Sequence, residues 1–469
     1  MTDDTAQPGD SGIPPPTALP GADDRLDRVD GLAFGLTTAI AFVGYWFTLA
    51  PNLTLEYSGL MSTGAMYAGV PHVPGYPVWT LYSWVFTKLL PFSNIAWRVA
   101  VGSAVASAIA CGLVALMVSR CGSILFAKAT TFVQPDASEQ AKLRVVCGTV
   151  AGLVLAFAGV VWRNAVVADI WALSLLLFVA VIASLLRWML SPAKRWFLAL
   201  ALFLLGLLLT SSQEMIVVFP GIVVAIMVAD PRLGRDAALF LLPLAAAMTS
   251  FDQYGVWISF LSIPNQPLVL TFAVVMLIGL ALAVKTRRIG TEWRDIFVCG
   301  GAFLLGLAFY FYVPIASMTT PPVNWGYPRT VEGFLHVIGR GQFERLDPIP
   351  LCDPFQFWEV FSDQCWTWAA VVGSEFGWPE LLIALIPFCF LGQIRPMMRC
   401  WLLALVAIGF GVGPMLLAEL NPPDHQAQRL VAHYFVATYA VLAVWLGLGL
   451  FFCGSLFANE QSHNALRTL

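Results

Sequence analysis

The stretch YPVWTLYSWVFTKLL, residues 76–90, decides how the rest of the chain is threaded through a membrane. It is apolar, but its fifteen residues fall short of the roughly 20 that a helix needs to cross a bilayer. Prolines flank it, and Trp79, Tyr82 and Trp84 are rings of the kind that collect at lipid headgroups. We therefore expect an interfacial helix that lies along the membrane without crossing it.

The composition indicates a polytopic membrane protein. Hydrophobic residues make up 59% and charged residues 11% of the chain, against roughly 45–50% and 25% in soluble domains. With a net charge of -3, no run rich in lysine and arginine and no glycine-rich phosphate loop, the sequence excludes nucleic-acid binding. We expect an integral, multi-pass protein of a bacterial inner membrane, with its site on the outer face.

Apolar runs of membrane-spanning character recur along the whole chain. They predict an all-α bundle of about 12 transmembrane helices with a long first outer loop that carries interfacial helices. The candidate spans are 31–50, 99–119, 145–162, 170–188, 197–211, 214–229, 237–251, 267–284, 296–316, 379–393, 400–418 and 432–453.

Leaving 76–90 outside the membrane core puts both termini in the cytoplasm. Of the 25 lysines and arginines, 18 then lie on the cytoplasmic side, as the positive-inside rule requires. The expected parts are a disordered cytoplasmic tail at 1–30, a transmembrane domain at 31–453, and a cytoplasmic C-terminal tail at 454–469. The outer segments, where chemistry could occur, are 51–98, 317–378 and 419–431.

The first outer segment contains LEYSGLMSTGAMYAGVPHVPGYPVW, residues 55–79. Non-helical backbone beside a bilayer is tolerated where protein or a water-filled cavity satisfies it, so this stretch is expected to wall a site. Glu56 is either a partly desolvated general base or a solvated loop acid. His72, held by prolines and followed by Gly75, either donates to a phosphate and orients the acid or is a turn histidine satisfied by backbone.

Three more charged positions are candidates. Asp169 follows Arg163 by six residues and is either its ion-pair partner or a site carboxylate. Arg340, in the 317–378 segment, either faces an anion or belongs to a plain outer loop with a short amphipathic helix. Arg429 either grips a phosphate or snorkels at the end of the last span. The sequence carries no metal-binding motif, and it leaves a divalent-metal requirement open.

Four stretches, in this order, resemble a membrane family whose animal members are transmembrane protein O-mannosyltransferases: SGLMSTGAMYAGVPHVPGYPVW, VWRNAVVADIWALS, PIASMTTPPVNWGYPRTVEGF and NPPDHQAQRLVAHYF. The family looks like the GT-C glycosyltransferases. The resemblance implies a polyprenyl-phosphate sugar as donor, inverting transfer outside the cytoplasm, and a protein or glycan acceptor. It implies no resident cofactor beyond that lipid-linked donor.

Carried over by position, the resemblance assigns His72 and Tyr76 to the family's loop motif, and Asn324 and Trp325 to its third motif. Asp169 stands where the family usually has Glu. Within this reading His72 lies with Arg429 at the donor phosphate. The acid after the first span activates the acceptor hydroxyl, and Asp169 orients it or serves as a second acid.

Four positions depart from the family pattern. Tyr57 and Leu60 stand where the family has acids, Ser212 where it has His, and Ala316 where it has Arg. Either Glu56 has taken over as the base, or the donor differs, or catalysis has been lost.

The expected function is therefore transfer of a sugar, such as mannose, from a polyprenyl-phosphate donor to an extracytoplasmic acceptor, with protein Ser/Thr as the expected acceptor group. The alternatives are a non-catalytic binder or transporter of lipid-linked glycans and a structural membrane partner. Convergence of Glu56, His72, Asp169 and Arg429 on one outward-facing cavity would favour the enzyme.

Overall fold

The computed structural model describes residues 26–55, 57–125, 136–240, 265–287, 289–339, 341, 354–420 and 432–467. Three expected site residues, Glu56, Arg340 and Arg429, lie outside this part of the chain. So do most of the expected tail at 1–30, most of the outer segment 419–431, and the greater part of the expected span 237–251.

Helices form the described architecture, and six helical segments are long and apolar enough to cross a bilayer. A bent pair raises that number to seven. The six segments are α1 (Arg28–Thr48), α4 (Ile95–Ile124), α5 (Ala137–Phe157), α7 (Trp171–Leu190), the run Trp293–Met318 made of α12 (Trp293–Leu307), η3 (Ala308–Phe311) and α13 (Tyr312–Met318), and the run Ala432–Phe457 made of η5 (Ala432–Phe435) and most of α19 (Val436–Arg467).

Shorter apolar helices coincide with four other expected spans. They are α8 (Trp196–Ser211), η1 (Gln213–Val218) with α9 (Phe219–Ala229), part of α11 (Asn265–Thr286), and part of α17 (Pro396–Leu420). The chain is thus an integral, multi-pass membrane protein. The count of about 12 spans and the GT-C-like arrangement stay predictions.

Small residues let the helices pack closely. A Cβ built on Gly206 of α8 would lie 2.9 Å from the Cα of Gly306 in α12, and the converse distance is the same. On α5, a Cβ at Gly152 would lie 2.6 Å from the carbonyl oxygen of Cys111 in α4. Lipid tails are as apolar as the helices, so such close backbone contact, rather than a hydrophobic drive, holds membrane helices together.

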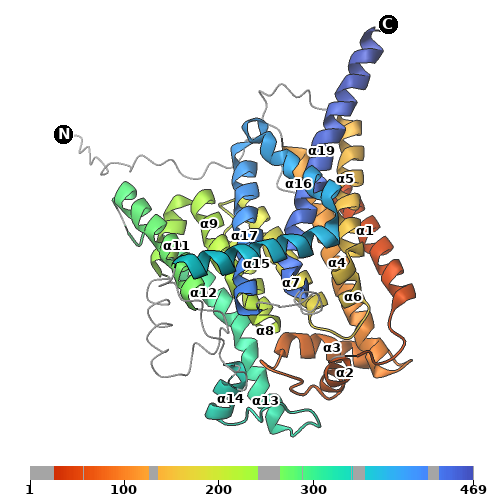
Figure 1. Ribbon diagram of the computed structural model, residues 1–469, viewed down its shortest axis with the longest axis vertical. Coiled ribbons are helices and arrows are strands. Elements are labelled where there is room, and N and C mark those ends of the chain that lie inside the picture. Colours follow the sequence, from red (N-terminus) through yellow and green to blue (C-terminus); the bar gives the residue numbers. More distant parts are fainter. Residues whose placement is uncertain are drawn as a thin grey trace, which may run out of the picture.

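The first outer segment leaves the bundle and returns to the same end of it. Asn94 Nδ2, just before α4, donates to the carbonyl oxygen of Pro51, just after α1, at 2.8 Å. Between them lie α2 (Ser58–Tyr67) and α3 (Pro77–Leu89), and α3 runs across the long axis of the bundle (Figure 1). Residues 76–90 thus form a helix that does not cross the bundle. Its depth in the membrane stays a prediction.

Two of the three rings expected at the lipid headgroups face protein instead. Trp79 is 1% exposed, and its Nε1 donates to the Asp169 carbonyl oxygen at 2.8 Å. The Tyr82 hydroxyl donates to the Gly102 carbonyl oxygen of α4 at 2.7 Å, and burial raises the Tyr82 pKa above its usual range. Only Trp84 keeps a substantial exposed surface, 37%. The polar tips of Trp79 and Tyr82 thus bond backbone carbonyls of the protein, and the depth of both rings in the membrane stays a prediction.

The structure also differs from the expected loops and tails. The segment 317–378 contains α14 (Val331–Ile338) and the 23-residue α15 (Pro354–Phe376), which runs across the bundle in Figure 1. At Gly377 the chain bends by 105° between the segment 365–376 and α16 (Trp378–Cys389), and η4 (Leu391–Gln393) follows. At the chain ends, α1 already begins at Arg28 behind an Asp27 capping box, and α19 continues to Arg467.

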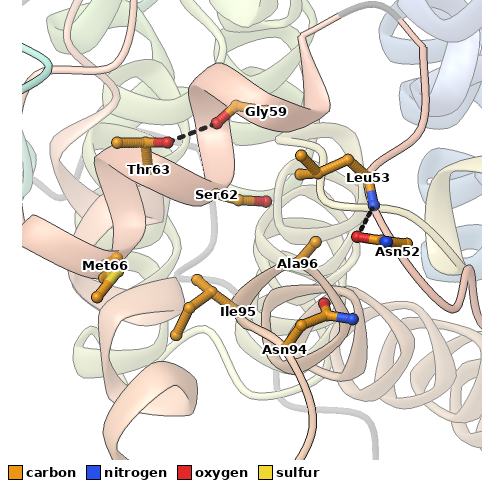
Figure 2. Close-up of a pocket in the computed structure, with 9 residues that line it drawn as sticks. All are labelled: Asn52, Leu53, Gly59, Ser62, Thr63, Met66, Asn94, Ile95 and Ala96. Carbon is orange, nitrogen blue, oxygen red and sulfur yellow. Dashed lines mark hydrogen bonds between the residues drawn. The ribbon is translucent and has the colours of Figure 1, made fainter.

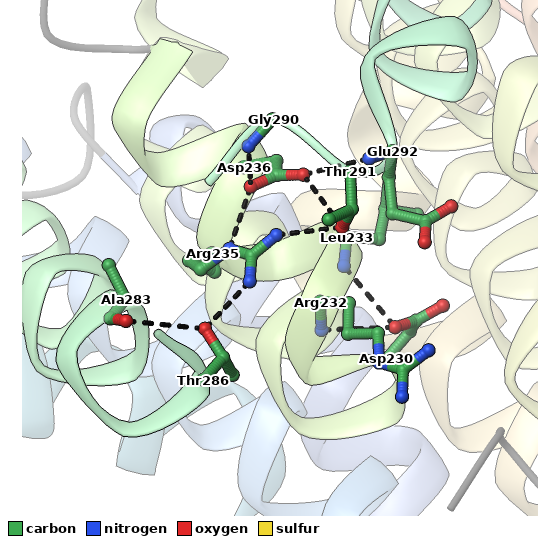
Figure 3. Close-up of polar contacts among 10 residues, drawn as sticks. All are labelled: Asp230, Arg232, Leu233, Arg235, Asp236, Ala283, Thr286, Gly290, Thr291 and Glu292. Carbon is green, nitrogen blue, oxygen red and sulfur yellow. Dashed lines mark hydrogen bonds and ion pairs between the residues drawn. The ribbon is translucent and has the colours of Figure 1, made fainter. Parts of the chain in front are cut away.

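The opposite end of the bundle is held by charged groups. Arg235, 1% exposed at the side chain, donates to Asp236 Oδ1 at 2.7 Å, to Thr286 Oγ1 at 2.7 Å and to Thr291 Oγ1 at 2.8 Å (Figure 3). Asp236 also accepts from the Glu292 backbone N–H at 2.9 Å. We call these five residues the inner cluster. It ties the helix at 231–240 to the ends of α11 and α12.

A second buried ion pair joins the first helices at that same end. Arg144 of α5 lies 2.7 Å from Asp30 and 2.8 Å from Asp27, and its Nε donates to the Ser119 carbonyl oxygen of α4 at 3.0 Å. Basic side chains thus gather opposite α2 and α3, in keeping with the expected cytoplasmic side.

Candidate functional site

The first outer loop is docked onto the segment that follows α13. Val70 N donates to the Val323 carbonyl oxygen at 3.1 Å, and Trp325 N donates to the Val70 carbonyl oxygen at 3.0 Å, which makes a short parallel bridge. The Tyr312 hydroxyl donates to the Ala68 carbonyl oxygen. Two stretches about 250 residues apart, each singled out from the sequence, therefore form one unit.

His72 lies within an aromatic group built by this docking. Its ring centroid is 4.7 Å from that of Trp325 and 5.1 Å from that of Tyr57. Both neighbouring rings are exposed, Trp325 by 38% and Tyr57 by 58%, while His72 is half-buried. His72 Nδ1 lies 3.1 Å from the Val73 carbonyl oxygen, so a proton there would leave Nε2 as the acceptor nitrogen. We call Tyr57, His72 and Trp325 the outer aromatic group.

The backbone after His72 depends on a glycine. Gly75 has φ +104°, and a Cβ there would lie 2.7 Å from Val313 Cγ2. Gly75 N also donates to the His72 carbonyl oxygen at 2.6 Å. Tyr76 follows in the left-handed region and caps α3, with 9% of its surface exposed. The positive φ of Gly75 and its contact with α13 both require a glycine there, and Tyr76 is mainly a packing residue.

Asp169 is fixed from α3. Trp79 holds its carbonyl oxygen, as described above, and its own Oδ1 accepts from the Ile170 backbone N–H at 2.6 Å. Among the ion pairs of the described residues there is none between Arg163 and Asp169. Asp169 is half-buried at the end of the bundle where α3 lies, and its role as a site carboxylate stays a prediction.

Buried polar atoms near this assembly lack partners. Asn324 Nδ2 donates to the Ser317 carbonyl oxygen at 3.3 Å, but Asn324 Oδ1 and Ser317 Oγ have none. Gln213 Nε2 donates to the Ile338 carbonyl oxygen at 3.1 Å, and its Oε1 has none. Ser212, where the family usually has His, bonds Ser174 Oγ at 2.8 Å. Such orphaned atoms are few in folded proteins, so they mark places where water or a ligand can bind.

The structure thus brings together His72, Trp325 and Asn324, with Tyr76 and Asp169 placed by α3. The remaining expected residues fall outside the described chain, but Tyr57, next to Glu56, touches His72. Sequence reasoning treated Tyr57 only as a missing acid. Its contact with His72 depends on how the loop folds back, which no local sequence pattern specifies. No three His, Cys, Asp or Glu residues of the described chain could hold a metal ion.

Comparison with known proteins agrees with the first two of the four stretches. Residues 58–234 match the model of the protein O-mannosyl-transferase TMEM260 N-terminal domain. The mouse protein O-mannosyl-transferase TMEM260 is 28% identical over 166 residues, which are 35% of this chain and 20% of the mouse protein. No solved structure matches the chain. The expected resemblance to a membrane O-mannosyltransferase-related family is confirmed over a region that includes His72, Tyr76 and Asp169.

Proposed function

We propose, from this similarity and from the docked outer loops, that the chain is a membrane glycosyltransferase of GT-C type. It would transfer a sugar, such as mannose, from a polyprenyl-phosphate donor to a Ser/Thr hydroxyl of an extracytoplasmic protein. The observation that carries the proposal is the contact of His72 with Trp325, which unites two family motifs at the end of the bundle where Asp169 is also held.

In this proposal Glu56 is the general base. It accepts the proton of the acceptor hydroxyl while that oxygen attacks the anomeric carbon of the sugar. The bond from the anomeric carbon to the phosphate oxygen breaks on the opposite face, and the polyprenyl phosphate leaves with the electron pair. The configuration at the anomeric carbon inverts.

The other residues bind and orient. Arg429 donates to the leaving phosphate, whose charge grows in the transition state, and His72 does so through Nε2 as an imidazolium that keeps its Nδ1 proton on the Val73 carbonyl oxygen. Asp169 orients the acceptor, and its fixed backbone supports a single geometry. The exposed faces of Tyr57 and Trp325 offer apolar surface to a sugar ring, while Asn324 and Arg340 line the acceptor side.

The proposal is tested with protein in lipid nanodiscs, a polyprenyl-phosphate mannose and a Ser/Thr-rich peptide. We expect Glu56→Gln to lower the transfer rate by about 100-fold or more, with an unchanged unfolding temperature. Glu332→Gln, at an exposed acid of α14, is the matched control and should transfer like the wild type. Normal transfer by Glu56→Gln would show that Glu56 is not the base.

One observation favours the second candidate, a non-catalytic binder or transporter of lipid-linked glycans. The Tyr57 ring stands where the family has an acid, and it packs beside His72. In the same assay, saturable binding of the lipid-linked sugar with no transfer to any acceptor would favour that alternative over the enzyme.

A further inference from the structure

A cavity of about 220 Å³ lies on the far side of α2 from His72. Its walls are α2, the residues just after α1 at 52–53, and the start of α4 at 94–96 (Figure 2). It is smaller than the roughly 300–1,000 Å³ of drug-sized sites, which suits a ligand of a single ring.

One face of α2 forms a wall of this cavity. Gly59, Ser62, Thr63 and Met66 line it, at the i, i+3, i+4 and i+7 spacing that places residues on one side of a helix. Gly64 lies on the opposite side, where a Cβ would come within 3.2 Å of the Pro71 Cα. The helix therefore separates the cavity from the outer aromatic group. The SGLMSTGAM motif forms a wall of this cavity and takes no part in the proposed transfer step.

Ser62 gives the cavity an unsatisfied polar group. The residue is 4% exposed, and its Oγ is buried with no hydrogen-bond partner. Figure 2 shows the hydroxyl pointing into the space between Leu53 and Ala96. A helical hydroxyl can bond a backbone carbonyl of its own helix, as Thr63 does to Gly59 at 2.9 Å, but Ser62 does not. Its hydrogen bond is available to a ligand.

The other polar groups of the wall are neutral. Asn52 Oδ1 accepts from Leu53 N at 2.8 Å, which leaves the amide N–H groups of Asn52 for a ligand. Asn94 is engaged by Pro51 and Trp97. None of the described lining residues is charged, and the nearby Arg98 donates with all three side-chain nitrogens to backbone carbonyls.

These groups favour a neutral ligand over an anion. A phosphate would need a cation or several donors, whereas the described wall offers hydroxyls and an amide beside apolar side chains such as Met66 and Ile95. A sugar ring presents the complementary surface, with hydroxyls at its edge and C–H groups on its faces.

We propose that this cavity binds one neutral hexose unit, on the face of α2 turned away from the outer aromatic group. Binding itself does not depend on transfer. Only the role of the cavity rests on the proposed function. In that role it holds a sugar already present on an acceptor while the next transfer takes place on the other side of α2.

The test measures binding of methyl α-mannoside to the full chain in nanodiscs by isothermal titration. We expect Gly59→Val to abolish binding, because a Cβ at Gly59 has only Leu53 Cδ1 within 4.0 Å, so the new side chain fills the cavity without a clash. Gly35→Val on α1, where nothing lies within 4 Å, is the matched control and should bind normally.

Ser62→Ala separates ligand binding from folding. Since Ser62 Oγ has no hydrogen-bond partner among the described residues, its loss should leave the unfolding temperature unchanged or higher, while the affinity for the glycoside falls by about 2- to 10-fold. Unaltered affinity in Gly59→Val, or no saturable binding by the wild type, would overturn the inference.

Two further arms separate the outcomes. The first arm adds a mannosyl lipid to the nanodisc. If both this lipid and the soluble glycoside bind, the sugar site accepts both sources. If only the lipid binds, a sugar-specific cavity is rejected. Glu56→Gln should bind the glycoside normally even if it transfers nothing, so failure of the proposed transfer and failure of the sugar site give different results.

Discussion

The inner cluster and the docked outer loops differ in how completely their polar groups are paired. In the inner cluster each side-chain nitrogen of Arg235 donates to a protein oxygen, and Asp236 accepts from two backbone N–H groups besides Arg235. Around α2 and α3, Ser62 Oγ, Asn324 Oδ1 and Gln213 Oε1 are buried without partners.

The difference separates groups that hold the fold from groups that can hold something else. A buried charge is tolerated when its partners are complete, so the inner cluster is structural. A buried polar atom without a partner is costly unless water or a ligand satisfies it. The docked outer loops combine such atoms with the exposed rings of Tyr57 and Trp325, so we expect binding there.

The largest expected effect is at the inner end. Arg235→Met would leave the Asp236 side chain, 4% exposed, without its counter-charge, and should lower the free energy of unfolding by about 3–5 kcal/mol. Denaturant unfolding in detergent measures it. The double variant with Asp236→Asn should recover most of the loss, because the uncompensated charge is then gone. A loss below about 1 kcal/mol in the single variant would contradict a structural role.

At the outer end, Gly69→Ala should separate the two docked loops. Its Cβ would lie 2.5 Å from the Val323 carbonyl oxygen, which accepts from Val70. We expect a stability cost of about 1–3 kcal/mol and a loss of sugar transfer, because His72 and Trp325 move apart. Trp325 fluorescence in a background without other outer tryptophans reports the separation. Gly31→Ala, where nothing lies within 4 Å, is the control, and equal behaviour of both variants would disprove the docking argument.

A smaller effect is expected when Asp169 loses its support. Trp79→Phe keeps an aromatic ring but removes the 2.8 Å bond to the Asp169 carbonyl oxygen, at a cost of about 1 kcal/mol. Transfer should fall by roughly 10-fold while donor binding changes little, since small misplacements affect the reaction step most. Trp84→Phe, on the same helix at a 37% exposed position, serves as the comparison. An equal loss in both would mean that α3 as a whole, and not Asp169, is affected.

The smallest effect returns to the inner end. Burial and the charge of Asp230 raise the Glu292 pKa. A carboxyl whose folded pKa is raised destabilises the fold above that pKa, and the penalty vanishes as the pH falls below the unfolded value of about 4.3. Glu292→Gln should therefore raise the free energy of unfolding by about 0.3 kcal/mol at pH 7 and leave it almost unchanged near pH 4. Thermal unfolding at both pH values checks this, with Glu332→Gln as the exposed control; a constant difference would refute it.

The pKa of Asp236, in the same cluster as Glu292, is shifted in the opposite direction. Burial raises the Asp236 pKa, but Arg235 and the N–H groups of Glu292 and Gly290 lower it further, so the net pKa is depressed. Its contribution to stability is present above the unfolded pKa of about 3.9 and is lost as the pH falls through the folded value. The two acids, in one polar network, should thus respond to acid in opposite directions.

Much of the architecture could be predicted from apolar length and loop charge. Six described segments match expected spans, and the helix at 76–90 was expected not to cross. The sequence could not predict that Trp79 Nε1 and the Tyr82 hydroxyl donate to backbone carbonyls, because the polar tip of an amphipathic ring can bond a lipid headgroup or a protein carbonyl equally well. The sequence did not predict the helix α15, because an outer segment with aromatic and acidic residues has the composition of a loop and its packing is not visible in the sequence.

The sequence by itself determined that this is a multi-pass membrane protein of helices, related to membrane O-mannosyltransferases, with polar motifs in the segments between spans. Hydrophobic length and motif spacing are local properties, so they can be read along the chain. Only the tertiary structure decided that Val70 pairs beside Asn324, that His72 meets Tyr57 and Trp325, and that Ser62 faces a cavity with its hydroxyl unpaired. These facts depend on close approach between residues far apart in sequence, which no local pattern specifies.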